Sequence, residues 1–172
     1  LIPVVRRCWS LRGQRPVAPY QTQYEWAYLY SALEVDGDHA AQFLCLPEVN
    51  LGMSRLFLEH LAARDPEAEH GVLWDQAGFH PAAGSPELPA RIHWIALPPY
   101  RPELNPVAAI GDLIKDRIAN TLWHTLESLE QALEEELRPL DESAARVRRL
   151  VSHPWLVQQV NAIAAENSAI TN

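Results

Sequence analysis

Two apolar segments early in the chain predict a β-hairpin. Residues 24 to 35, YEWAYLYSALEV, are aromatic and apolar with partial alternation, which is typical of a strand that faces a core. Asp36, Gly37 and Asp38 form a turn signal, and residues 39 to 46, HAAQFLCL, return as a second strand. We therefore expect antiparallel pairing between these two segments.

The apolar spacing then changes to that of a helix and returns to short strands. Asn50 is a good N-cap, and apolar residues recur at helical spacing after it until Asp65 and Pro66 stop the run. Residues 71 to 74 and 92 to 97 are short apolar runs that predict two buried strands, separated by a loop rich in Gly and Pro. Asp75 is therefore expected at the carboxyl end of a strand.

The rest of the chain is predicted to be helical. One helix covers about 107 to 123, Thr125 caps the next, Asp141 caps another that runs to about 152, and a last helix covers about 155 to 165. The tail after Glu166 is expected to fray. The order of hairpin, helix, two strands and helix predicts an α/β layer sandwich with a mixed sheet.

Length and charge narrow the function classes. With 172 residues, 48% of them hydrophobic, the chain is expected to form one domain. A net charge of −8 argues against a protein that grips nucleic acid over its whole surface, because phosphate binding depends on Lys and Arg. Any DNA contact must be local. Arg6, Arg7, Arg12 and Arg15 cluster near the start, where a solvated surface is the simplest interpretation.

The two cysteines and the hydropathy pattern bear on location. Cys8 and Cys45 support neither a disulfide framework nor a zinc module and fit a reducing cytosol. No apolar run is long enough to span a membrane, and no signal-peptide plan is visible, so a soluble cytoplasmic protein is expected. The chain starts at Leu1 without a methionine, which we interpret as a start inside a longer reading frame.

Two linked motifs carry the chemistry: LWDQAGFH at 73 to 80 and LPPYRPELNPVAAIGDLIKD at 97 to 116. Together they resemble the catalytic domain of the mariner-like insertion-sequence transposases of the DDE endonuclease superfamily. That family places an Asp after a strand in an Asp-Asn-Ala-x-x-His setting. A Pro-Pro-Tyr-Ser-Pro-(Glu/Asp)-Leu-Asn-Pro-(Ile/Val)-Glu segment follows, and two motifs at this separation are a specific signal.

The resemblance implies an α/β fold of the ribonuclease H-like class, with a mixed sheet flanked by helices. The family's first strand, with its first catalytic Asp, is expected to precede Leu1 and is absent from the chain. We thus expect a partial catalytic domain over 1–138 and a C-terminal helical extension over 139–172. Intact family members cut and join DNA ends with Mg²⁺ or Mn²⁺ held by several carboxylates, and two such ions clamp the attacking and leaving oxygens.

Asp75 matches the family's second Asp and is the one catalytic and metal-binding acid that the resemblance carries over; an Asp that merely caps a turn is the alternative. At the position of the third acid the chain has Ala108. Gly111 replaces an expected aromatic residue, and Gln76 replaces the usual Asn. With one of three acids present, the chain is expected neither to nick nor to join DNA.

Three residues are candidates for a substitute or supporting role. Asp112 lies one turn beyond Ala108, about 6 Å along the helix axis, which is too far for a direct ligand unless the helix shifts. Glu103 is interpreted as a loop residue before that helix. His80 is either a phosphate or ion contact or a packing residue. Tyr100 and Arg101 border the same loop, where packing and solvent contact are the favoured roles.

Three hypotheses remain open. The first is a truncated, degenerate transposase domain with weak or absent DNA binding. The second is a non-catalytic module that pairs with itself or with an intact transposase, for which the space left by Gly111 and an exposed apolar patch would be signs. The third, an unrelated metal-dependent nuclease, requires both motifs to arise by chance.

Overall fold

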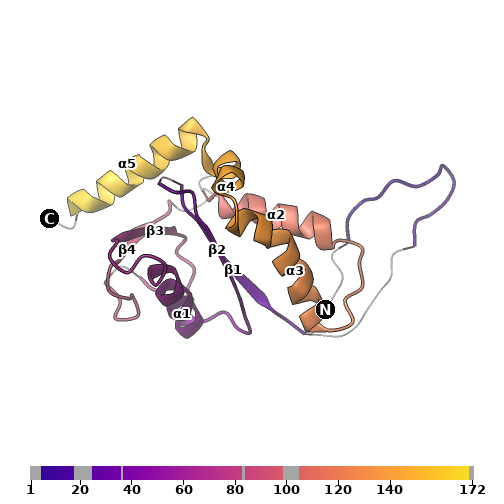
Figure 1. The fold of residues 1–172 in the computed structure, drawn as a ribbon, viewed down its shortest axis with the longest axis horizontal. Helices are drawn as coiled ribbons and strands as arrows, with labels where there is room; N and C mark the ends of the chain where they lie inside the picture. Colours follow the sequence, from indigo (N-terminus) through magenta and orange to yellow (C-terminus); the bar gives the residue numbers. More distant parts are fainter. Residues whose placement is uncertain (1–4, 18–24, 36, 83, 99–104, 171–172) are drawn as a thin grey trace.

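The computed structural model describes residues 5–17, 25–35, 37–82, 84–98 and 105–170. Within them the chain forms five helices and two small sheets in the order ββαββαααα (Figure 1). The predicted order of hairpin, helix, two strands and helices is confirmed. The fold class is mixed α/β.

The hairpin consists of β1 (Tyr28–Leu33) and β2 (Ala41–Leu46). The strands pair antiparallel, with Leu33 opposite Ala41, as predicted. Both are shorter than the apolar segments because Glu34 closes the connecting loop: its backbone N–H donates to the Ala40 carbonyl at 2.9 Å, and its carboxylate accepts from the Ala40 N–H at 3.0 Å.

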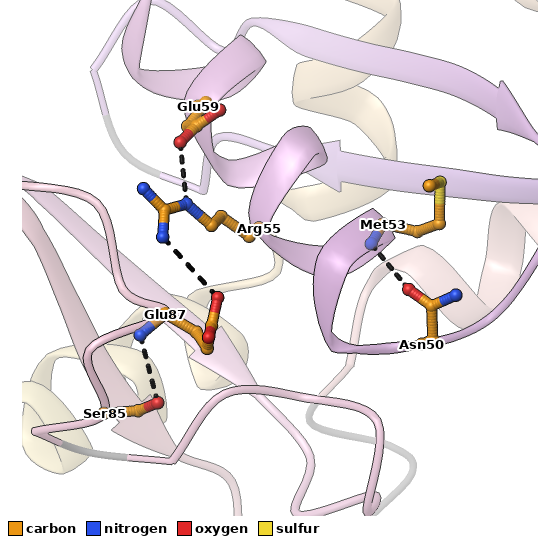
Figure 2. Close-up of polar contacts among 6 residues, drawn as sticks. All are labelled: Asn50, Met53, Arg55, Glu59, Ser85 and Glu87. Carbon is orange, nitrogen blue, oxygen red and sulfur yellow. Dashed lines mark hydrogen bonds and ion pairs between the residues drawn. The ribbon is translucent and has the colours of Figure 1, made fainter.

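Helix α1 (Leu51–Ala62) begins where the sequence predicts. The Asn50 side chain accepts a hydrogen bond from the Met53 N–H at 2.9 Å, which satisfies one of the free donors of the first turn (Figure 2). The helix buries Phe57 and Leu58, while its outer face carries charged residues.

Strands β3 (His70–Trp74) and β4 (Ile92–Ala96) form a parallel pair, with Trp74 opposite Ala96. The Leu97 N–H continues the ladder by donating to the Trp74 carbonyl at 2.9 Å. The described residues thus contain two two-stranded sheets, where a single mixed sheet was predicted. An apolar cluster of Tyr30, Leu46 and Phe57, with Trp74 packed against it, connects them.

The helical second half differs from its prediction at three ends. Helix α2 (Val107–Ile118) stops five residues early because Asn120 takes a left-handed backbone, φ 57°. Helix α3 (Leu126–Asp141) continues through Asp141, so the prediction that Asp141 caps the next helix is wrong; Ser143 precedes α4 (Ala144–Val151) instead.

The last helix, α5 (Pro154–Ile170), continues past the predicted end near residue 165. By contrast, the Thr125 cap of α3 is confirmed. The Thr125 hydroxyl accepts a hydrogen bond from the Ser128 N–H, and the Ser128 hydroxyl oxygen accepts one from the Thr125 N–H. Local capping chemistry was therefore easier to predict than helix ends.

The main core lies where α2 and α3 pack on the hairpin and α4 packs on α3, as Figure 1 shows. Its buried members come from β2 and from all four helices: Ala41, Ile110, Ile114, Leu133, Leu137, Leu140, Val147, Val151 and Leu156. The predicted boundary between 138 and 139 falls within α3, and it stays a prediction. Among the described residues, no helix has the length and apolarity to cross a membrane.

Candidate active site at the carboxyl end of β3

Asp75 directly follows β3, as predicted, and its side chain is 59% exposed. One carboxylate oxygen, Oδ1, accepts a hydrogen bond from the Ala77 N–H at 3.1 Å. This bond is a local turn of the kind that Asp forms with the backbone two residues on. The turn interpretation of Asp75 therefore has direct geometric support, and the exposed carboxylate also remains open to solvent.

His80 folds back onto Asp75. Its Nδ1 lies 2.7 Å from Asp75 Oδ1 and 3.1 Å from the Asp75 carbonyl oxygen. Both partners are acceptors, so Nδ1 must carry the proton and donate. Nε2 is then the nitrogen left for any further partner, and a neutral ring would present it as an acceptor.

The His80 ring is also a packing group. It is only 7% exposed and stacks on Trp74, with ring centroids 4.0 Å apart and planes 27° apart. Phe79 meets its edge at 4.4 Å. Of the two roles predicted for His80, packing and positioning of the Asp75 loop are what these contacts support.

Helix α1 and strand β4 hold the same loop. The Ser54 hydroxyl, fully buried on α1, donates to the Phe79 carbonyl at 2.7 Å. The Gln76 amide donates weakly to the Leu97 carbonyl at 3.4 Å, so the longer side chain ties the loop to β4. Sequence reasoning missed Ser54, although a small polar residue on the apolar face of a predicted helix was the available signal.

A second contact joins α1 to the segment that leads to β4. Arg55 pairs with Glu59 at 2.8 Å within the helix and with Glu87 at 3.5 Å across to the loop (Figure 2). These two carboxylates raise the pKa of Arg55 above its usual value, chiefly through the hydrogen bond to Glu59. An open hollow lies beside the loop, between the start of α1 and residues Gly78 and Phe79.

Ala108, where the resemblance predicts the third acid, lies on the first turn of α2. Ala108 is exposed there, and its N–H donates to the Asn105 carbonyl at 3.1 Å. A methyl group offers no ligand atom. One turn on, Gly111 is half-buried and has open space where a Cβ would stand. That an aromatic packing group has been lost there stays a prediction.

Asp112 does not take the place of the missing acid. Its side chain is 74% exposed and lies 3.8 Å from the Arg6 guanidinium, which also pairs with Asp116 at 3.2 Å. A segment more than a hundred residues away in sequence therefore holds this face of α2. Glu103, Tyr100 and Arg101 lie outside the described residues.

The donor set near Asp75 does not fit a two-ion centre. Within the described ranges no group of three or more His, Cys, Asp and Glu side chains is close enough to hold a metal ion. Asp75 brings one carboxylate, and the Nδ1 of its neighbour His80 is occupied. A pair of Mg²⁺ or Mn²⁺ ions requires several oxygen ligands around each ion.

Comparisons with known proteins agree with the motifs. The family model of the DDE superfamily endonucleases matches residues 1–130. One curated relative, Uncharacterized protein y4pE/y4sA of Sinorhizobium fredii (strain NBRC 101917 / NGR234), is 26% identical over 137 residues, which cover 78% of this chain and 93% of the relative. No solved structure matches the chain significantly. Because the match spans most of the chain and includes β3, Asp75 and α2, this protein belongs to the DDE superfamily endonuclease family.

Proposed function

We propose that this chain is part of a mariner-like insertion-sequence transposase catalytic domain that, as it stands, neither nicks nor joins DNA. The family membership supports a transposase-like nuclease domain. The narrower assignment to the mariner-like insertion-sequence transposases rests on the linked motifs around Asp75 and Asn105.

The proposal includes a ribonuclease H-like arrangement of the described elements. Two observations support it: the order of hairpin, helix, Asp-bearing strand, strand and helix, and the division of the strands into one antiparallel and one parallel pair. A strand between β1 and β3 would join the two pairs into one mixed sheet of the kind predicted. The cluster of Tyr30, Phe57 and Trp74 already brings the two pairs into one packed body.

The observation that carries the loss of activity is the exposed Ala108 on α2. In-line displacement at phosphorus depends on carboxylates that hold two divalent ions on opposite sides of the reacting phosphate. Asp75 alone cannot hold that pair, and Asp112 is paired with Arg6 instead. In this chain His80 and the Ala77 N–H still orient the Asp75 carboxylate.

The test is Mn²⁺-dependent nicking of supercoiled plasmid. The unaltered chain, an Ala108→Glu variant, and the same variant extended at its N-terminus by an Asp-bearing strand are compared in parallel. We expect nicking from the extended Ala108→Glu protein alone, since it has three acids. Asp75→Asn in that protein is the matched control and should remove the nicking.

If the unaltered chain cleaves the plasmid and Asp75→Asn abolishes that cleavage, the proposal is contradicted. Asp112 or Glu103 would then be examined as a substitute acid. No cleavage by the extended Ala108→Glu protein would contradict the transposase assignment of these positions. Each outcome can be read only if the variants unfold at similar temperatures, so a thermal unfolding curve accompanies every sample.

A second candidate function is a non-catalytic interaction module. It is favoured by large apolar side chains that lie in solvent near the start of the chain, Val5, Trp9, Leu11 and Val17 among them. Such exposure on a folded domain often marks a partner surface.

A further inference from the structure

Three exposed arginines lie on α4, in an acid-free part of an acidic chain. They are Arg146, Arg148 and Arg149, here called the α4 arginines. Residues 143–165 contain these three and no Asp, Glu or Lys, which gives the segment a charge of +3. With the whole chain at −8, the remaining residues together carry −11. The positive charge on this helix is therefore a local exception within the protein.

The α4 arginines are unpaired among the described residues, whereas six other arginines of the chain form ion pairs with carboxylates. Those six are Arg6, Arg55, Arg64, Arg91, Arg117 and Arg138. Arg148 and Arg149 lie in the last turn of α4, where their charge also favours the helix dipole. That interaction uses no N–H group of the guanidinium, so all three side chains remain able to donate to an external anion.

The other side of α4 fixes the helix in the main core. Val147 and Val151 are 0% exposed and share a buried cluster with Ile110 of α2. Arg146 and Arg149, three residues apart, lie on one side of the helix, away from these valines. Figure 1 shows α4 between α3 and α5, and α5 in turn contacts β4. The α4 arginines therefore project from a helix that is held by the core.

Duplex DNA is the anion that this surface fits. A guanidinium presents its N–H donors in a planar fork that matches a phosphate, and arginines clustered on one helix can meet neighbouring phosphates of a strand. An acidic chain requires a local cluster of this kind to bind DNA, because binding depends on Lys and Arg that displace counterions from phosphates. The chain belongs to the DDE superfamily endonucleases, yet the family match ends at residue 130, before α4. The cluster thus lies outside the part of the chain that the family model describes.

We propose that Arg146, Arg148 and Arg149 bind the phosphate backbone of duplex DNA without reading its sequence. This rests on the proposed function, because it takes DNA as the ligand of a transposase-like domain, and it requires neither a metal ion nor a catalytic acid. The guanidinium groups donate to phosphate oxygens and to no base edge. Affinity therefore depends on salt concentration and not on the DNA sequence.

The test is fluorescence anisotropy of a labelled DNA duplex of arbitrary sequence, titrated with the full chain over a series of NaCl concentrations and without divalent metal. We expect binding that weakens as the salt concentration rises. Arg146→Gln, Arg148→Gln and Arg149→Gln in one chain should raise the dissociation constant at least about tenfold at low salt. They should also reduce the slope of the logarithm of the binding constant against the logarithm of salt concentration by about 2.7, since each phosphate contact contributes about 0.9.

Two further variants control for total charge and for folding. Arg7→Gln, Arg12→Gln and Arg15→Gln in one chain remove the same charge from the loop before β1, which Figure 1 shows at the opposite end of the molecule from α5. Affinity should then change by less than about twofold, because exposed charges more than about 10 Å away are screened. Arg→Lys changes at the three α4 positions keep the charge and should retain most of the affinity, since Lys also binds phosphate. If the triple Gln variant unfolds at a lower temperature, Arg146→Gln alone takes its place and should reduce the slope by about 0.9.

The absence of duplex binding by the unaltered chain at low salt would overturn the proposal, as would an unchanged affinity of the Gln variant of α4. An equal loss in the variant of Arg7, Arg12 and Arg15 would attribute binding to total charge and overturn α4 as the contact surface. Tighter binding of an RNA duplex of the same sequence would overturn DNA as the ligand. These measurements involve neither metal nor nicking, so their failure leaves the transposase assignment untouched. Conversely, failure of the Ala108→Glu nicking test would leave a measured α4-dependent binding in place.

Discussion

The two faces of α2 differ in burial and in the side chains that they carry. Its inner face places Ile110 and Ile114 in the main core at 1% and 6% exposure. Its opposite side has the exposed Ala108 and the half-buried Gly111, which has open space where a Cβ would stand. One helix thus combines a packed face with a face that holds no core contact at these two positions.

The same contrast appears between the main core and the carboxyl end of β3. In the core, residues from β2 and four helices exclude water from one another, and apolar burial of this kind provides most of the stability of a domain. At β3 the Asp75 carboxylate is mostly in solvent and is oriented by its own turn and by His80. The Asp75 carboxylate therefore contributes little to the stability of the fold.

The largest expected effect tests the two faces of α2 directly. Ile110→Ala should lower the free energy of unfolding by about 2–5 kcal/mol, because it removes a fully buried side chain and leaves a cavity. Leu113→Ala, on the exposed side of the same helix, should change it by less than about 1 kcal/mol. Urea unfolding followed by circular dichroism measures both, and equal losses would refute the contrast.

A smaller effect distinguishes packing from chemistry at β3. His80→Ala should cost about 1–3 kcal/mol, since it removes a buried ring stacked on Trp74 and leaves the Asp75 loop without its clamp. Asp75→Asn should cost less than about 0.5 kcal/mol, because an amide oxygen still accepts from Ala77 and His80. Thermal unfolding with and without Mn²⁺ is the measurement; a Mn²⁺-dependent stabilisation that Asp75→Asn removes would reveal a retained metal site.

The smallest effect concerns the start of α3. The Glu127 backbone N–H and the Thr125 hydroxyl both donate to the Glu127 carboxylate and hold its pKa below the ordinary 4.5. A carboxyl group whose pKa is lower in the folded state contributes stability above the ordinary value, and this contribution is lost as the pH falls through the folded pKa. Glu127→Gln should therefore lower the unfolding temperature slightly at pH 7 and not at pH 2.5. An equal decrease at both values would disprove the ionic contribution.

Local signals predicted much of this molecule correctly. The alternation around the Asp36 turn predicted the hairpin, and Asn50 and Thr125 predicted two helix starts, because a cap depends on residues three positions apart. The linked motifs predicted the family, the place of Asp75 and its neighbour His80. Helix ends were less predictable: Asp141 was predicted to cap a helix but is the last residue of α3, and the apolar spacing gave no sign that α2 ends before the left-handed Asn120.

By itself, the sequence determined the elements and their order, since both depend on residue identity and short spacing. Only the tertiary structure decided that Arg6 pairs with Asp112 and Asp116, that Ser54 holds the loop at Phe79, and that the Trp9 side chain is fully exposed. Such contacts join residues 25 to more than 100 positions apart. They form only when the free energy gained by packing the core offsets the entropy cost of bringing those segments together. No local sequence pattern encodes that packing.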